Sequence, residues 1–135
     1  MSTPATTADA TGRMTTLEFF AGVREGRLVV QRCTTCGALF VPPKAVCPNC
    51  EGVSWGRAAL GGDGEVASYT VIRVPPTRFA AEAPYVVTVA RMAEGVSLLG
   101  RLTGAPIDAL HVGMPVRFVG SATNADPPVI AFRPR

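Results

Sequence analysis

The sequence predicts a mainly β fold in which a small cysteine-bearing module precedes a barrel of short strands. Twelve prolines and 14 glycines cut the 135-residue chain into short runs, which favours strands and turns over long helices. All four cysteines fall within residues 33–50, and short apolar runs recur from residue 64 onward. Apolar residues make up 47% of the chain and charged residues 17%, so we expect a globular protein and not a disordered one.

The N-terminal part predicts one short helix. Residues 1–13 are small and polar without periodicity, and we expect a flexible tail there. Thr15 and Glu18 fit a capping box and Gly26 fits a C-terminal stop, which predicts a helix of about ten residues. So short a helix is marginal alone and must dock, either on its own domain or into a partner subunit. Its apolar side chains are Leu17, Phe20 and Val23, close to one stripe, and Phe19 beside them.

The cysteines form two C-x-x-C pairs, Cys33 with Cys36 and Cys47 with Cys50, separated by ten residues. Four soft thiolate ligands in tetrahedral geometry suit Zn²⁺. Such a site has no open coordination position, so we expect a structural ion and no metal catalysis. A thioredoxin-type motif needs one C-x-x-C at a helix start in a βαβ setting, and rubredoxin-like iron normally uses a much longer spacing between its pairs.

Short strands flank the cysteine segment. Residues 28–33 (LVVQRC) lead into it, and residues 51–60 (EGVSWGRAAL) form a return strand whose Trp55 covers the metal site. The module is a rubredoxin-like four-cysteine zinc ribbon. It is too small to bury enough apolar surface without the ion.

Five short strands follow the turn GGDGEV at residues 61–66. A short helical segment, residues 106–113, separates the third strand from the fourth, and this order matches an OB-type barrel. We therefore place the helix and ribbon at residues 14–57 and the OB-fold domain at residues 58–135. The five strand runs are residues 64–74, 85–92, 96–104, 114–120 and 127–135.

Each barrel strand carries an arginine that we expect to point outward or to end the strand. Side chains alternate between the two faces of a strand, which places Arg101, Arg117 and Arg133 opposite the apolar face. Arg73 and Arg91 end the first two strands. Arginine suits phosphate and carboxylate binding, but a solvated surface explains the same pattern.

Charge and targeting signals exclude several function classes. The formal net charge is +3, and four thiolates on one divalent ion change it by −4 + 2 = −2, to about +1. This value weakens a nucleic-acid interpretation. The N-terminus has no apolar signal region, and no apolar run approaches the roughly 20 residues that span a bilayer, so we expect a cytoplasmic protein.

Candidate catalytic groups are scarce. His111 is the one histidine of the chain and lies in a turn before a strand. The sequence has no G-x-S-x-G, P-loop or G-x-G-x-x-G motif, and its acidic residues are scattered singly. We therefore predict no catalytic residue in this chain and no enzyme activity on its own.

Several motifs together resemble a known family. They are FFAGVREGRLVVQRCTTCG, FVPPKAVCPNC, GEVASYTVIRVPP, APYVVTVARM, LLGRLTG, HVGMPVRF and FRP, which fall within residues 17–134. In this order they resemble the zinc-ribbon/OB-fold family (domain of unknown function 35) that accompanies thiolase-like enzymes. The resemblance implies a non-catalytic accessory subunit of a thiolase, acyltransferase or aldolase complex, with the catalytic groups on the larger subunit.

The resemblance also implies contacts with the partner and with coenzyme A. The N-terminal helix, with Leu17, Phe19, Phe20 and Val23, would dock the partner, and the chain would help to bind CoA or acyl-CoA. We assign this ligand to the loop of residues 75–84, where Arg78 would take a phosphate and Phe79 would stack on adenine or line an acyl channel. Tyr69 and Arg73 would extend the same surface. The alternative is that this loop packs only locally or against the partner.

Two other functions remain open at the sequence level. One is a single-stranded nucleic-acid-binding OB module, which needs aromatic side chains on a basic groove. The other is a free-standing acyl-CoA carrier or sensor. The barrel has five aromatic residues, and strand alternation places two of them, Phe118 and Phe132, inward, which leaves few to stack on bases. The other three are Tyr69, Phe79 and Tyr85.

Overall fold

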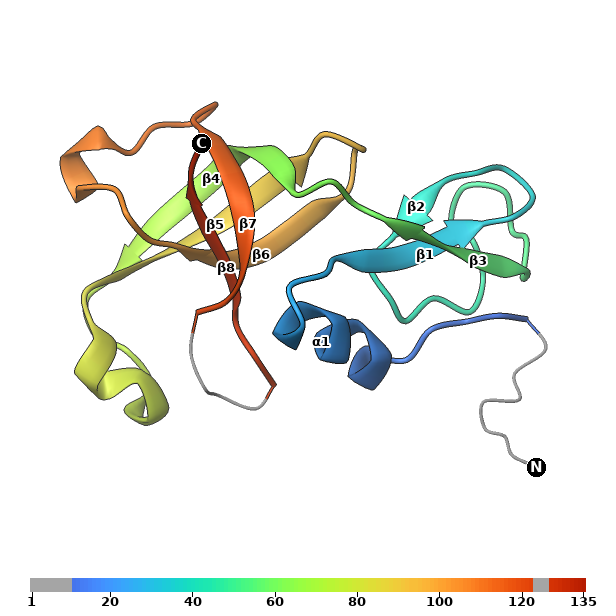
Figure 1. Cartoon of the computed structure of the whole chain (residues 1–135), viewed down its shortest axis with the longest axis horizontal. Coiled ribbons are helices and arrows are strands. Elements are labelled where there is room, and N and C mark those ends of the chain that lie inside the picture. Colours follow the sequence, from blue (N-terminus) through green and yellow to red (C-terminus); the bar gives the residue numbers. More distant parts are fainter. Residues whose placement is uncertain (1–10, 123–126) are drawn as a thin grey trace.

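The computed structural model describes residues 11–122 and 127–135, which form a ribbon module and a barrel side by side, with a helix below them (Figure 1). Most of the predicted tail, residues 1–10, lies outside the described residues. Its last residues are held against the ribbon, because Trp55 N donates to Thr11 O at 2.7 Å. No helix in the described ranges is long and apolar enough to cross a membrane.

The predicted helix is present as α1, Thr16–Arg24. Thr15 is its N-cap, and its Oγ1 accepts a hydrogen bond from Glu18 N at 3.0 Å, which satisfies one of the free amides of the first turn. The helix ends before Gly26, whose φ of +82° is the left-handed conformation that glycine tolerates.

The face that α1 buries differs from the predicted stripe. Phe19 and Val23 are 4% and 0% exposed, whereas Leu17 is 82% exposed and Phe20 is half-buried. Phe19 and Val23 lie four residues apart, one helical turn, and both pack into this chain's own core. Leu17, which shares the predicted stripe, does not pack on this chain, and its contact with a partner stays a prediction.

The ribbon is a three-stranded antiparallel sheet in the order β2-β1-β3. The buried side chain of Gln31 fixes the loop beside it: its Nε2 donates to Lys44 O at 3.0 Å, and its Oε1 accepts from Lys44 N at 2.9 Å. This pairing gives each polar atom of the buried amide a hydrogen-bond partner. The strands are β1 Val29–Cys33, β2 Leu39–Phe40 and β3 Trp55–Ala59.

The barrel is closed by five strands in the order β4-β5-β6-β8-β7, which confirms the predicted OB-type fold. All pairs are antiparallel except β6 with β8. A 3₁₀ helix, η2, separates the third barrel strand from the fourth, as predicted, and a second one, η1, follows the first strand. The elements are β4 Asp63–Ile72, η1 Thr77–Glu82, β5 Tyr85–Met92, β6 Ser97–Leu102, η2 Ile107–Ala109, β7 Pro115–Ser121 and β8 Ile130–Pro134.

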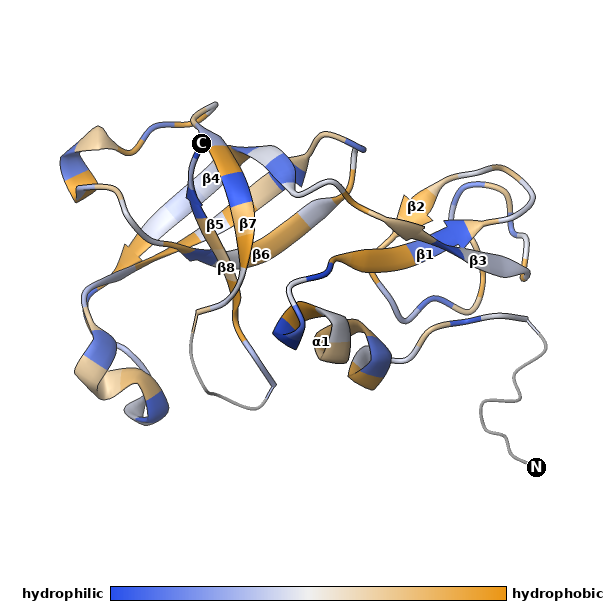
Figure 2. Ribbon diagram, viewed as in Figure 1, coloured by the Kyte–Doolittle hydropathy of each residue, from blue (hydrophilic) through white to orange (hydrophobic). Residues whose placement is uncertain are grey.

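One hydrophobic core joins the two modules. Met14, α1 and the start of β1 contribute to the same buried cluster as the barrel strands, including Val116 and Phe132. Hydrophobic stretches of α1, β1 and the barrel strands are orange in Figure 2. The helix therefore docks on its own chain. The ribbon cannot unfold without uncovering part of the barrel core.

We predicted that Arg101 points outward to solvent, but the structure buries it. It is 6% exposed, although it lies on the outer face of β6, because η1 folds back over that part of the strand. Its Nη1 forms an ion pair with Glu82 of η1. Strand alternation gives the face of a residue correctly but cannot indicate that another segment covers it. Arg91, Arg117 and Arg133 are exposed as predicted.

An ion pair fastens α1 to the ribbon. Arg57 of β3 binds the Glu18 carboxylate with two groups, Nε to Oε2 at 2.6 Å and Nη2 to Oε1 at 2.9 Å, and its Nη1 donates to Gly12 O at 3.1 Å. The hydrogen bond from Arg57 holds the pKa of Glu18 below its ordinary value. Two-pronged pairing of this kind is the favourable case among surface ion pairs.

We expect Glu18→Gln to lower the free energy of unfolding by about 0.5–1 kcal/mol at neutral pH. The folded pKa of Glu18 lies below the unfolded one, so its contribution is present above about pH 4.3. It is lost as the pH falls through the folded value. Urea denaturation of wild type and variant at pH 7 and pH 3.5 measures the difference in the free energy of unfolding and its dependence on pH. Glu25→Gln is the control, because Glu25 pairs only with the neighbouring exposed Arg27. Equal losses in both variants would contradict the assignment.

Candidate functional site

The four cysteines form two matching turns. Gly37 N donates to Cys33 O and Glu51 N donates to Cys47 O, both at 2.8 Å. The residue after each second cysteine has a positive φ, +81° at Gly37 and +66° at Glu51. Each turn thereby brings its two thiols to the same point, between β1 and the loop that precedes β3.

The four Sγ atoms fit a tetrahedral metal site. All lie within 4.8 Å of one another, with 3.6 Å between Cys33 and Cys50 and 3.7 Å between Cys36 and Cys47. A tetrahedron with Zn–S bonds of about 2.3 Å has edges of about 3.8 Å. The donor set and its spacing therefore suit one Zn²⁺ with no position left for water or substrate, as the sequence predicted.

The environment of Cys36 favours the thiolate form that a metal needs, whereas burial and hydrogen bonds with the other three thiols raise the pKa of Cys50 to about 12. Asn49 Nδ2 donates to Cys36 Sγ at 3.4 Å; with a backbone hydrogen bond at Ala38, this lowers the pKa of Cys36 to about 6. Trp55 covers the buried side of the cluster, as predicted, with its Nε1 donating to Ala45 O at 3.2 Å. The indole of Trp55 therefore shields one side of the cluster from water, and Asn49 donates a hydrogen bond to a thiol on the other.

The residue with positive φ is glycine in the first turn and glutamate in the second, and this predicts opposite effects of substitution. A left-handed conformation costs a non-glycine residue roughly 1 kcal/mol. Glu51→Gly is therefore expected to stabilise the zinc-loaded protein by up to about 1 kcal/mol, and Gly37→Ala to destabilise it by a similar amount. Thermal unfolding of the zinc-loaded variants measures both. Shifts of the same sign would show that turn conformation does not limit the stability of the ribbon.

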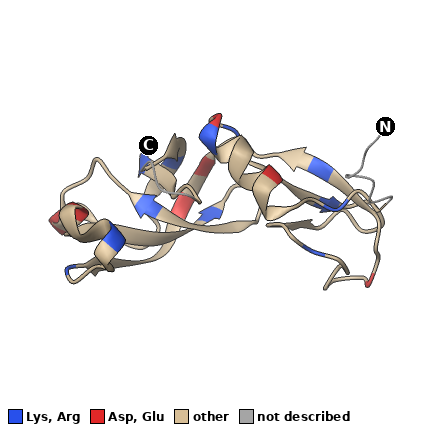
Figure 3. Cartoon of the chain, turned by 90° about the horizontal axis from the view of Figure 1, so that it is seen from below, with Lys and Arg blue, Asp and Glu red and all other residues tan. Residues whose placement is uncertain are grey.

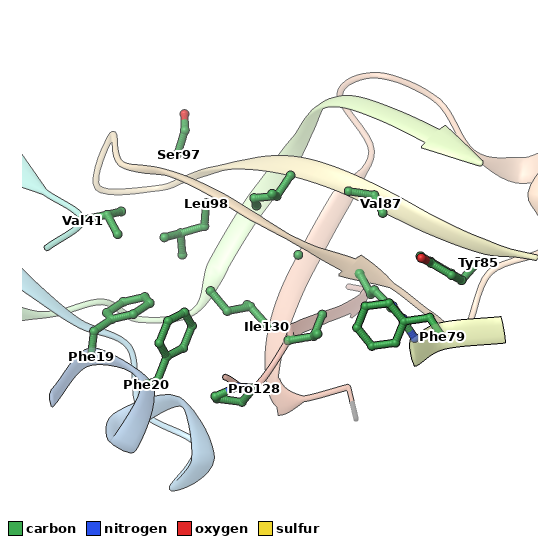
Figure 4. Close-up of a pocket in the computed structure, with 14 residues that line it drawn as sticks. Phe19, Phe20, Val41, Phe79, Tyr85, Val87, Ser97, Leu98, Pro128 and Ile130 are labelled. Atoms are coloured by element: carbon green, nitrogen blue, oxygen red, sulfur yellow. The ribbon is translucent and has the colours of Figure 1, made fainter. Parts of the chain in front are cut away.

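A second feature is an apolar groove between α1, the ribbon and the barrel. Its volume is about 470 Å³, and its walls come from α1, η1, β5, β6 and the start of β8 (Figure 4). Phe19 and Phe20 stand at one end of it and Phe79 and Tyr85 at the other, as Figure 4 shows. The lining residues are Phe19, Phe20, Val41, Phe79, Tyr85, Val87, Ser97, Leu98, Leu99, Gly100, Arg101, Pro128, Val129 and Ile130.

The η1 end of the groove holds a buried cation among aromatic rings. The guanidinium carbon of Arg101 lies 3.8 Å from the ring centre of Tyr85 and 4.5 Å from that of Phe79, close enough for cation–π attraction. Arg78 lies on the same Phe79 ring at 4.4 Å. The sequence missed Arg101, Tyr85 and Glu82 as parts of one cluster because they come from three different elements.

The predicted CoA residues divide into two groups. Arg78 and Phe79 lie together on η1, and Phe79 lines the groove. Tyr69 and Arg73 are not among the lining residues; the Tyr69 hydroxyl instead donates to Leu110 O at 3.2 Å. The predicted docking residues divide too: Phe19 and Phe20 line the groove, Val23 is fully buried in the core, and Leu17 projects to solvent.

The fold and the cysteine cluster define a class of protein, a zinc ribbon followed by an OB-fold barrel. Two family models match the chain. The rubredoxin-like zinc ribbon domain of ChsH2 matches residues 20–54, and the C-terminal OB-fold domain of ChsH2 matches residues 58–121.

Named relatives agree with these models. A "Probable enoyl-CoA hydratase alpha subunit" of Thermomonospora curvata is 39% identical over 118 residues, 86% of this chain but 36% of that protein. A "DUF35 domain-containing scaffold protein" of Methanocaldococcus jannaschii is 31% identical over 93 residues, 68% of this chain and 66% of that protein. A solved structure described as "Ltp2-ChsH2(DUF35) aldolase" is 36% identical, with a TM-score of 0.75, over 86% of this chain and 91% of that one.

The chain belongs to the ChsH2/DUF35 family of zinc-ribbon and OB-fold proteins. It spans about a third of the length of the Thermomonospora relative and about two thirds of the Methanocaldococcus relative. The family match confirms the resemblance that the sequence motifs indicated. It also supports Zn²⁺ as the ion of the four-cysteine site.

Proposed function

We propose that the chain is a non-catalytic accessory subunit of a thiolase-like enzyme that acts on acyl-CoA substrates. The observation that carries this proposal is the composition of the groove. Among residues 11–122 and 127–135, the lining side chains include aromatic rings, aliphatic groups, one serine and one arginine, but no histidine, cysteine or carboxylate. A binding surface without a nucleophile and base fits a subunit whose catalytic groups lie on a partner.

The relatives support the same proposal. One is named a scaffold protein, and another belongs to a structure described as an aldolase that combines Ltp2 with ChsH2. The hydratase name of the Thermomonospora relative belongs to a protein of which this chain matches about a third. We infer from these names a hetero-oligomer in which this chain holds its partner and contributes to the acyl-CoA site.

Co-expression tests the proposed function. The tagged chain is expressed with a thiolase-like protein of the same genome, and the complex is purified and assayed for turnover of acyl-CoA. We expect a stoichiometric complex whose activity exceeds that of either protein alone. Separate elution of the two proteins, with full activity in the thiolase-like protein alone, would contradict the proposal.

We further propose that Arg78 contacts a phosphate of CoA in that complex. Arg78 is exposed on η1 beside Phe79, so its guanidinium is free to meet an anion at the mouth of the groove. Arg78→Met is expected to raise KM for acyl-CoA about tenfold, equivalent to roughly 1.4 kcal/mol, with little change in kcat. The control is Arg91→Met, an exposed arginine of β5 outside the groove. An unchanged KM in Arg78→Met would refute the contact.

The barrel gives little support to the nucleic-acid alternative. Phe132 is fully buried, and Phe79 and Tyr85 are engaged with Arg101. Acidic and basic residues are interspersed over the described ribbon and barrel (Figure 3), whereas single-strand binding needs a continuous basic groove with stacking rings.

A further inference from the structure

We propose that the groove binds the acyl part of a ligand, with the acyl oxygen accepting a hydrogen bond from Arg101. This inference rests on the proposed acyl-CoA function and names the part of the ligand that this subunit takes. The ligand chemistry is an apolar chain that ends in a carbonyl or carboxylate oxygen. A thioester and a free carboxylic acid both supply it.

The body of the groove suits an apolar chain. Its volume of about 470 Å³ lies in the range of small-molecule sites. Phe20, Leu98 and Ile130 face the space between α1 and the barrel in Figure 4. Leu99, which is 65% exposed, borders the same space. Burial of such a surface by a chain of methylene groups is favourable.

Arg101 gives the groove a polar end. Its guanidinium is almost fully buried, with Nη1 paired to Glu82 and its carbon against the rings of Tyr85 and Phe79. Nη2 is buried too, and none of the described residues gives it a hydrogen-bond partner. A buried donor of a charged group that lacks an acceptor is uncommon and costs free energy. An oxygen of the ligand would satisfy it, and a charged donor makes a strong hydrogen bond.

The segment η1 provides access to that donor. Nη2 is covered in this conformation, so an oxygen reaches it only when η1 shifts. No residue of η1 is buried. The segment contacts Arg101 through the carboxylate of Glu82 and the ring of Phe79. A small shift of η1 would move the Phe79 ring away from Arg101 and let a ligand oxygen take its place. The aromatic ring then closes over the chain.

Binding to the full-length zinc-loaded chain tests the inference. Isothermal titration calorimetry is run with four probes: dodecanoate, dodecanoyl-CoA, dodecan-1-ol and CoA. Ser97→Trp fills the groove from an exposed strand position, and Val112→Trp places the same side chain on an exposed residue outside it. Arg101→Met removes the donor, and Arg91→Met is its matched control on β5. Zinc content and circular dichroism establish that each variant is folded.

The expected results separate the two parts of the proposal. Dodecanoate and dodecanoyl-CoA should bind wild type, at least tenfold more tightly than dodecan-1-ol and CoA respectively. Ser97→Trp should weaken both dodecanoyl probes at least tenfold, with Val112→Trp unchanged. Arg101→Met should remove the preference for dodecanoate over the alcohol, whereas Arg91→Met should keep it. The ratio of the two dodecanoyl probes tells whether a free acid or a thioester is the better ligand.

Three outcomes would overturn the inference. They are no binding of either dodecanoyl probe up to about 100 µM, equal binding to Ser97→Trp and wild type, and an acid preference that survives in Arg101→Met. If Ser97→Trp impairs only capture of the thiolase-like partner, the groove is a protein-docking face and the ligand assignment is wrong. The titration needs no partner, so absence of probe binding would overturn this inference and leave the proposed function standing. Failure to capture the thiolase-like partner, with probe binding intact, would contradict the proposed function and leave this inference standing.

Discussion

Replacing Cys47 by serine is expected to abolish zinc binding and to unfold the ribbon. Cys47 is fully buried, and its Sγ lies 3.7 Å from Cys36 Sγ in the cluster. A serine hydroxyl is a poor zinc ligand, and the remaining three thiols leave the site open. Structural Zn²⁺ contributes about 10 kcal/mol or more to the folding of small zinc domains. The ribbon, with three short strands, has no comparable source of stability.

The effect should extend beyond the ribbon. The core shared with the barrel includes Leu28 and Val30 from the ribbon and Phe19 from α1. Unfolding of the ribbon would therefore expose barrel residues and one end of the groove. Zinc content by mass spectrometry and backbone NMR spectra measure the loss. Val46→Ser is the control, because Val46 is half-exposed beside Cys47 and donates no ligand. Full zinc content with dispersed ribbon signals in Cys47→Ser would contradict the structural role of the ion.

Gly100→Ala is expected to destabilise the barrel by about 2–3 kcal/mol. A Cβ at Gly100 would lie 2.6 Å from Ile130 O and 2.8 Å from Cε2 of Phe132. These distances are far below van der Waals contact. Both obstacles are rigid, one being backbone and the other the ring of a fully buried side chain. The parallel pairing of β6 with β8 must therefore shift to admit the methyl group.

Gly61→Ala is the matched control for this substitution. A Cβ there meets only Glu94 Oε2, at 3.5 Å, which is ordinary contact. We expect its free energy of unfolding in urea to change by less than about 0.5 kcal/mol. Similar losses in the two variants would show that close approach of β6 and β8 is not what requires Gly100.

The cysteine site could be predicted from the sequence because its information is local. The spacing of Cys33, Cys36, Cys47 and Cys50 specifies two turns and a tetrahedral donor set without knowledge of the rest of the fold. The five-strand pattern was also readable, since apolar alternation and turn residues mark each strand. These features depend on neighbours within a few residues along the chain.

The groove could not be predicted in the same way because its residues come from distant elements. Alternation placed Arg101 on the outer face of β6, but only the path of η1 decides that Glu82 and Phe79 cover it. Likewise, the helical pattern placed Leu17 on the apolar stripe and Phe19 beside it. The position of the barrel selected Phe19 and left Leu17 82% exposed.

We propose that this chain acts through a partner enzyme and needs its zinc-held fold to do so. Reconstitution tests it most directly: the purified thiolase-like protein is titrated with wild-type chain or with Cys47→Ser, and acyl-CoA turnover is measured. We predict that wild type raises turnover to a plateau at a fixed stoichiometric ratio, whereas Cys47→Ser produces no increase. Turnover that is independent of the added chain, or that rises equally with Cys47→Ser, would contradict the claim.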